Sequence, residues 1–154
     1  MEKHKSHSSK DEINIFEVRN GLLLEAMDSL GVCTPIQAAS IWAYGVKNRN
    51  AAFQYSVMSD KLKEIYKCEM EKNAPNWVTG VSSPWIDSYS ILRIESTSFN
   101  TYIVEIIFYF STSTGHYKSS KAFLLLCNED NCYKINKISM ENFLYPYTGF
   151  ALKK

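Results

Sequence analysis

Apolar residues early in the chain recur at the three- and four-residue spacing of a helix face. Leu23, Met27 and Leu30 share such a face. They predict a helix over residues 16–30, and Gly31 supplies the usual stop signal. Because one side of this helix is apolar, we expect it to lie on a core.

The next helix has a better-marked start. Thr34 suits the N-cap, Pro35 suits the first helical position, and Gln37 completes the capping-box arrangement. Trp42 lies on the apolar stripe that follows. The same spacing and capping signals continue along the chain. In the first part of the chain they predict helices over residues 16–30, 34–46, 50–57 and 59–71.

After residue 73 the helix period disappears and a period of two takes over. The clearest run is residues 101–112, where apolar side chains from Tyr102 to Phe110 occupy one face and Glu105 lies on the other. Polar turns separate the predicted strands, which cover residues 86–97, 101–112, 117–127 and 132–140. Helices gathered first and about four consecutive antiparallel strands afterwards indicate an α+β domain whose helices cover one face of the sheet.

Length and composition fit one folded domain. The chain has 154 residues, of which 45% are hydrophobic and 21% charged. This mixture is typical of globular proteins and argues against a disordered or coiled-coil chain. Residues 1–12 are mostly polar and predict a flexible tail, so residues 13–154 are predicted to form a single domain.

Charge and glycine spacing narrow the function classes. Lys and Arg total 17 against 16 Asp and Glu. The chain therefore lacks the excess of basic residues that would indicate nucleic acid binding. The six glycines do not cluster as a phosphate-binding loop would require. No run of about twenty apolar residues could span a membrane, so we expect no membrane span in this chain.

The cysteines and histidines bear on disulfides, metals and localisation. Cys127 and Cys132 flank a turn-forming segment, which could place them opposite each other in a hairpin, and we therefore consider a disulfide between them. An oxidised pair would favour an extracytoplasmic or cell-envelope protein over a cytoplasmic one. His4, His7 and His116 are scattered, and no second ligand pair has metal-binding spacing, so we predict no metal.

The order of elements resembles the nuclear transport factor two-like superfamily, with bacterial extracytoplasmic or regulatory members the most similar. The resemblance spans about residues 32–140. It rests on Thr34-Pro35 opening a helix that carries Trp42, on residues 47–50 followed by Tyr55, and on the last strand, residues 132–138. It implies a cone-like fold, in which a curved antiparallel sheet wraps a long helix and leaves an open apolar pocket.

Such a pocket predicts a ligand site made of aromatic residues. Trp42, Tyr55, Trp85 and Tyr89 are the candidates for its lining, although filling of the core is the simpler interpretation for Trp42. We expect no cofactor. The aromatic segment over residues 144–150 is predicted to fold back over the domain or to meet a second subunit.

Catalysis has one candidate route. An isomerase of this superfamily would need a carboxylate base in an apolar pocket, for which Asp87 is the candidate, and a tyrosine such as Tyr55 to hold an oxyanion. Glu105 falls on the opposite face from the apolar row. Dehydratase or nucleophilic catalysis would need a buried histidine, yet His116 lies in a predicted hairpin turn.

The leading hypothesis is a non-catalytic module of a bacterial envelope or regulatory protein. It would bind a small apolar ligand or a protein partner, through its pocket or its sheet face, as a homodimer. The alternatives are a ketosteroid-isomerase-like enzyme that uses Asp87 and a tyrosine, and a structural dimerisation domain whose pocket is filled by its own side chains.

Overall fold

The computed structural model describes the backbone of residues 8–152 and the side chains of residues 14–152. The chain divides into two compact units, Met1–Leu30 and Gly31–Lys154. The first unit contains a single helix, and the second contains the other helices and the sheet.

The first unit contains the helix α1 (Ser8–Ser29). The predicted helix over residues 16–30 is confirmed and begins earlier, so residues 8–12, predicted as part of a flexible tail, are helical. Polar residues suit solvent-exposed helical turns as well as they suit a tail. Residues 1–7 lie outside the described residues. The apolar side chains of α1 are largely exposed, with Leu24 and Met27 half-buried, so this unit contains no core of its own.

Three capped helices open the second unit: α2 (Pro35–Lys47), α3 (Ala51–Ser56) and α4 (Asp60–Asn73). The Thr34 hydroxyl accepts a hydrogen bond from the backbone N–H of Gln37, as the capping pattern predicts. The side chains of Asn50 and Ser59 cap α3 and α4 in the same way. Local capping therefore sets where each helix begins.

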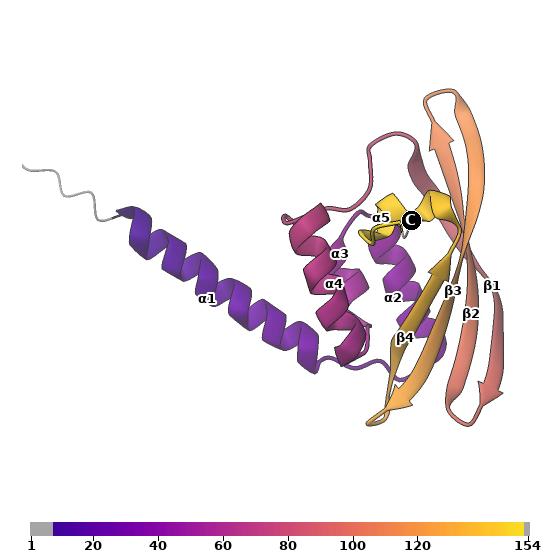
Figure 1. The fold of residues 1–154 in the computed structure, drawn as a ribbon, viewed down its shortest axis with the longest axis horizontal. Coiled ribbons are helices and arrows are strands. Elements are labelled where there is room, and N and C mark those ends of the chain that lie inside the picture. Colours follow the sequence, from indigo (N-terminus) through magenta and orange to yellow (C-terminus); the bar gives the residue numbers. More distant parts are fainter. Residues whose placement is uncertain (1–7, 153–154) are drawn as a thin grey trace, which may run out of the picture. The chain divides into compact units, whose positions relative to one another are not determined.

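The second half of this unit is a four-stranded antiparallel sheet in the order β1-β2-β3-β4. Its strands are β1 (Trp85–Ser98), β2 (Thr101–Thr112), β3 (Gly115–Glu129) and β4 (Cys132–Met140). The sheet is curved and unclosed, and the helices lie on one of its faces (Figure 1). The predicted α+β class is confirmed.

The core lies between α2 and the helix-covered face of the sheet. Trp42 on α2 and Phe108 on β2 are fully buried, with ring centroids 6.0 Å apart. Alternate residues of β2 and β3 complete the core, from Val104 to Phe110 on one strand and from Ala122 to Leu126 on the other. The predicted alternation along residues 101–112 is thus confirmed.

The chain ends in a short 3-10 turn, η1 (Asn142–Leu144), and a single helical turn, α5 (Tyr145–Thr148). The backbone N–H of Gly80 donates to the carbonyl of Pro146, and the Tyr147 hydroxyl donates to the carbonyl of Pro84. The Phe150 ring packs against Tyr66 at a centroid distance of 5.1 Å. The aromatic segment therefore folds back over its own domain, one of the two arrangements expected for it.

The two edges of the sheet differ. The outer edge of β4 is bonded to the segments that connect the helices: Tyr133 N–H donates to Val32 O at 2.9 Å, and Ile135 N–H donates to Val57 O at 2.8 Å. Ser59 N–H donates in turn to Ile135 O at 2.9 Å. No such bonds are found along the outer edge of β1 within the described residues.

Candidate functional site

The four predicted ligand-binding residues lie in different surroundings. The ring centroids of Trp42 and Tyr89 each lie 6.0 Å from that of Phe108. Trp85, at the start of β1, is 39% exposed. Trp42 therefore lies in the core, whereas Tyr89 is half-buried beside Phe108 and Trp85 is exposed.

Tyr55 belongs to a second aromatic cluster between the helices. Its ring is fully buried and lies 5.3 Å from the ring of Trp77, which follows α4. The ammonium groups of Lys63 and Lys67 lie 4.9 and 5.3 Å from the centroid of the Tyr55 ring. Cation–π contacts of this kind stabilise the packing of α3 against α4.

Large side chains of the domain itself lie in its interior, where Trp42, Phe108 and Leu124 are all fully buried. The indole Nε1–H of Trp42 is the one buried side-chain polar atom in the described part of the chain that has no hydrogen-bond acceptor. A buried donor without an acceptor is costly, and one ordered water would satisfy it.

Asp87, the candidate catalytic base, lies at a β-bulge and is exposed. Ile86 pairs with Phe110 and Ser88 pairs with Tyr109, so Asp87 is the extra residue between two regular pairs. The predicted base would lie in an apolar pocket, whereas Asp87 is exposed. The exposure of Asp87 could not be predicted from the sequence, because the alternation of a strand does not indicate where a bulge occurs.

The structure does not form the Cys127–Cys132 disulfide. Asp130 and Asn131, both with left-handed φ, make a two-residue turn, shorter than the predicted segment of four residues. The resulting register pairs Cys132 with Glu129 and Cys127 with Lys134. The two cysteines are therefore diagonal neighbours instead of direct partners, and both are free.

A buried polar network holds the loop after α4 against the helices. The Gln54 amide donates to Thr79 Oγ1 at 3.2 Å, and the Tyr66 hydroxyl donates to Gln54 Oε1 at 3.1 Å. Burial raises the pKa of Tyr66 far above its ordinary value. Arg49, with a left-handed φ of 57°, adds a bond from Nε to the Thr79 carbonyl at 2.8 Å. The network could not be predicted from the sequence, because its members lie far apart along the chain.

An open cleft of about 380 Å³ lies where the C-terminal segment meets the loop after α4. Its walls are the segments over residues 73–80 and 142–152. The Asn73 amide donates to the Gly149 carbonyl at 3.1 Å, which ties the two walls together. Gly149 has a left-handed φ of 81°, and Met70 would collide with any Cβ there. The cleft depends on the return of the chain end, which local sequence patterns do not reveal.

The outer face of the sheet, which no helix of the second unit covers, carries an apolar patch. Its half-buried apolar residues come from the two central strands: Ile103, Ile107, Tyr109, Phe123 and Leu125. We call these five residues the sheet patch. The sequence signal for it was present, since these positions alternate with the core residues of β2 and β3.

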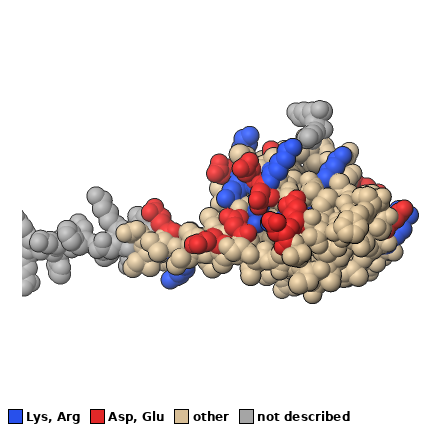
Figure 2. All heavy atoms as spheres, turned by 90° about the horizontal axis from the view of Figure 1, so that it is seen from below, with Lys and Arg blue, Asp and Glu red and all other residues tan. Residues whose placement is uncertain are grey.

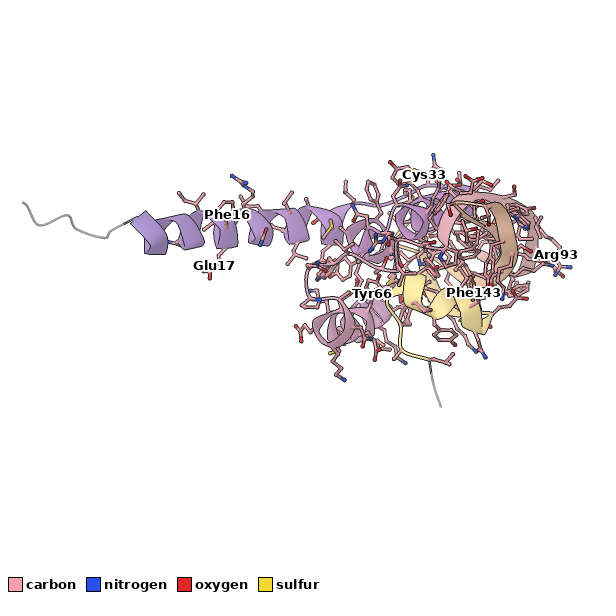
Figure 3. All side chains as sticks on the ribbon, turned by 90° about the horizontal axis from the view of Figure 1, so that it is seen from above. Phe16, Glu17, Cys33, Tyr66, Arg93 and Phe143 are labelled. Carbon is pink, nitrogen blue, oxygen red and sulfur yellow. The ribbon has the colours of Figure 1, made fainter. Side chains whose placement is uncertain are left out.

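Ionised side chains interrupt the sheet patch, because Glu105 pairs with Phe123 and Lys121 pairs with Ile107 on the same face of the sheet. Glu105 accepts a hydrogen bond from Lys121 Nζ at 2.9 Å and lies 3.6 Å from Arg93 Nε. Lys121, through this bond and its charge, and then Arg93, hold the pKa of Glu105 below its usual range. The predicted placement of Glu105 opposite the apolar row is confirmed. Figure 3 shows Arg93 pointing away from the body of the domain.

Surface charge is mixed. In the view of Figure 2, acidic and basic side chains lie close together in one area, and a broad adjoining area carries neither. Within the described residues, no three His, Cys, Asp or Glu side chains gather as a metal site would require. Over the same part of the chain, no helix has the length and apolar character to cross a membrane.

Comparison with known proteins yields no relative: no protein-family model matches the chain, and no curated protein matches it significantly.

Proposed function

We propose that the chain is a non-catalytic protein-binding module and that the sheet patch is its contact surface. The observation that carries this proposal is the contrast between the two faces of the sheet. The helix-covered face is packed with the side chains of its own domain. The outer face holds a cluster of apolar side chains that no element of the domain covers. Clusters of this kind are typical of interaction surfaces.

The chemistry of the sheet patch suits a polypeptide partner. Tyr109 and Phe123 supply aromatic area, which is enriched in protein interfaces. Glu105, Lys121 and Arg93 supply charges next to the apolar residues. A partner with an apolar surface and matching charges among its apolar residues would gain both affinity and orientation there.

The proposal favours a protein over a small ligand. Trp42, Phe108 and Leu124 are fully buried, so they present no exposed surface to an apolar ligand. The isomerase alternative loses its base, because Asp87 is exposed at a bulge.

We also propose the nuclear transport factor two-like fold for the second unit. Helices that precede a curved antiparallel sheet and cover one of its faces are compatible with that cone-like architecture. The bacterial envelope or regulatory setting is proposed on the same resemblance.

A site-specific photo-crosslink tests the contact surface. Leu125 is replaced with the photo-crosslinking residue p-benzoylphenylalanine, and the matched control carries this residue at Tyr117, an exposed position of β3 outside the sheet patch. We expect position 125, in the source cells, to give one adduct of defined mass and position 117 to give none. The partner identified in the adduct is then purified and its affinity measured directly.

A second substitution decides whether the adduct reports binding. Phe123→Lys places a charge in the centre of the sheet patch and should abolish both the adduct and the measured binding, while circular dichroism shows an unchanged fold. Equal adducts from positions 125 and 117, or binding that survives Phe123→Lys, would contradict the proposal. A small molecule retained by the wild-type protein in native mass spectrometry would favour the ligand-binding alternative.

A further inference from the structure

One edge of the sheet is unpaired. Within the described residues, the outer edge of β1 makes no backbone hydrogen bond to another segment. Such an edge presents a row of N–H and C=O groups that a further strand can bond, and proteins often block this with proline or lysine. Neither residue type occurs in β1. The outer edge of β1 is therefore available to a further strand.

Three β-bulges limit how much of this edge a further strand can use. The register of β1 against β2 shifts at Asp87, at Leu92 and at Thr97. Bulges bend an edge strand and interrupt its pairing. Between the last two bulges, residues 93–96 pair regularly with β2. We call these four residues the edge segment, because an added strand would find regular backbone there.

The edge segment carries two opposite charges on the outer face of the sheet. Arg93 pairs with Glu105 on β2, and Glu95 pairs with Ile103. The side chains of Arg93 and Glu95 are 61% and 59% exposed. Arg93 Nε lies 3.6 Å from Glu105, and Figure 3 shows this side chain pointing away from the domain. A guanidinium has five donors, so Arg93 can bind a second carboxylate.

This charge pattern is complementary to itself. When two copies of the strand pair antiparallel about a two-fold axis at Ile94, Arg93 of each copy lies opposite Glu95 of the other. Opposite charges directly across a strand pair stabilise it, and like charges destabilise it. A shift of two residues in either direction would set Arg93 against Arg93 or Glu95 against Glu95. A shift of one residue would set the apolar Ile94 against one of the charges.

We propose that two copies of this chain pair antiparallel through their edge segments, in the register centred on Ile94. Each Arg93 then lies between Glu105 of its own β2 and Glu95 of the other copy. The two outer faces become one continuous face, because directly opposite residues of an antiparallel pair point to the same side. This pairing goes beyond the proposed function and does not depend on the partner of the sheet patch.

Two charge reversals test this register in sedimentation velocity runs of the full chain over a range of concentrations. We expect the wild-type protein to form dimers. Arg93→Glu sets carboxylates opposite each other and Glu95→Arg sets guanidiniums opposite each other, so each should raise the dissociation constant by about ten-fold or more. An equimolar mixture of the two variants should recover dimers, because every opposed pair then joins opposite charges. Recovery would also show that both variants are folded.

Matched controls carry the same changes of charge away from the sheet. Lys72→Glu and Glu71→Arg alter exposed residues of α4 and should leave the dissociation constant unchanged, alone and mixed. Hydrogen exchange read by mass spectrometry locates the contact. Protection of the β1 amides should rise with the concentration of the wild-type protein and should not rise for Arg93→Glu.

Four outcomes would overturn the pairing: a monomer at every concentration, dimers that both reversals in β1 leave unchanged, a mixture of these variants that stays monomeric, or equal effects of the α4 controls. Dimers that survive the reversals in β1 but are lost on Phe123→Lys would place the contact on the sheet patch instead. The photo-crosslink from position 125 tests the proposed function separately, since Leu125 lies on β3 and outside the edge segment.

Discussion

The two units of the chain place their apolar residues in opposite ways. In the second unit, Trp42, Phe108 and Leu124 are fully buried, and the contacts that bury them join residues far apart in the sequence. In α1, Phe16 and Leu23 are more than half exposed. The same residue types are thus buried in a core in one unit and exposed on a helix surface in the other. Apolar periodicity predicts that a helix needs a partner, but it does not tell whether the partner lies in the same chain.

The largest loss of stability, and so the strongest test of this difference between the units, is expected from a substitution in the core between the helices and the sheet. Phe108→Ala removes a ring that contacts both Trp42 and Tyr89, and it should lower the free energy of unfolding by about 3–5 kcal/mol. Urea denaturation followed by tryptophan fluorescence measures the change. Leu23→Ala in α1 serves as the comparison and should leave that transition almost unchanged. If the two substitutions cost the same, the distinction between the units is wrong.

A smaller loss is expected from the buried polar network. Gln54→Leu leaves the Tyr66 hydroxyl without its acceptor and Thr79 Oγ1 without its donor, which should destabilise the second unit by about 1–3 kcal/mol. Thermal unfolding monitored by circular dichroism provides the measurement. The neighbouring residue Phe53 is exposed, so Phe53→Leu is a suitable control and should have little effect. An unchanged melting temperature for Gln54→Leu would mean that the network contributes nothing.

Acid should weaken the second unit through Glu105. Because Lys121 and Arg93 lower the pKa of this carboxyl in the folded state, its stabilising contribution is present above its unfolded pKa of about 4.3. That contribution is lost as the pH falls through the lower, folded-state pKa. Denaturant midpoints measured between about pH 2 and pH 7 should therefore fall less steeply for Glu105→Gln than for the wild-type protein. Curves of identical slope would exclude Glu105 as a source of the acid sensitivity.

The smallest effect is expected at the cysteine pair. Without a disulfide, Cys132→Ser should change the free energy of unfolding by much less than the 2–5 kcal/mol that loss of a native disulfide typically costs. Thiol titration of the denatured protein, purified without reductant, should detect all four cysteines. Detection of only two thiols would instead demonstrate a disulfide in the chain.

Local chemistry made much of the fold predictable. Thr34, Asn50 and Ser59 each cap a helix where the sequence indicates one, because capping needs only the next three residues. The strand over residues 101–112 was equally clear from its alternation. Capping and strand alternation both depend on residues close together in the chain, so they can be recognised in the sequence without knowledge of the tertiary structure.

The candidate site was harder to predict, because it depends on which distant residues meet. Tyr55 and Trp42 both look like pocket residues, yet Tyr55 packs on Trp77 and Trp42 on Phe108. The bulge at Asp87 moves one carboxylate out of the regular alternation. A two-residue turn in place of a four-residue segment changes the partner of Cys127. Each difference follows from pairing across strands or helices, which no single segment encodes.

The unequal edges of the sheet limit how these molecules could join through backbone bonds. Residues of the same chain already occupy the first half of the outer edge of β4, through Val32, Val57 and Ser59. Two molecules that met at their β1 strands would form one continuous sheet with a β4 edge at either end. Because the first half of each of those edges is already bonded, a further strand would have less of the edge to pair with. The hydrogen bonds that anchor the helical segments therefore also limit the addition of further strands to the sheet at this edge.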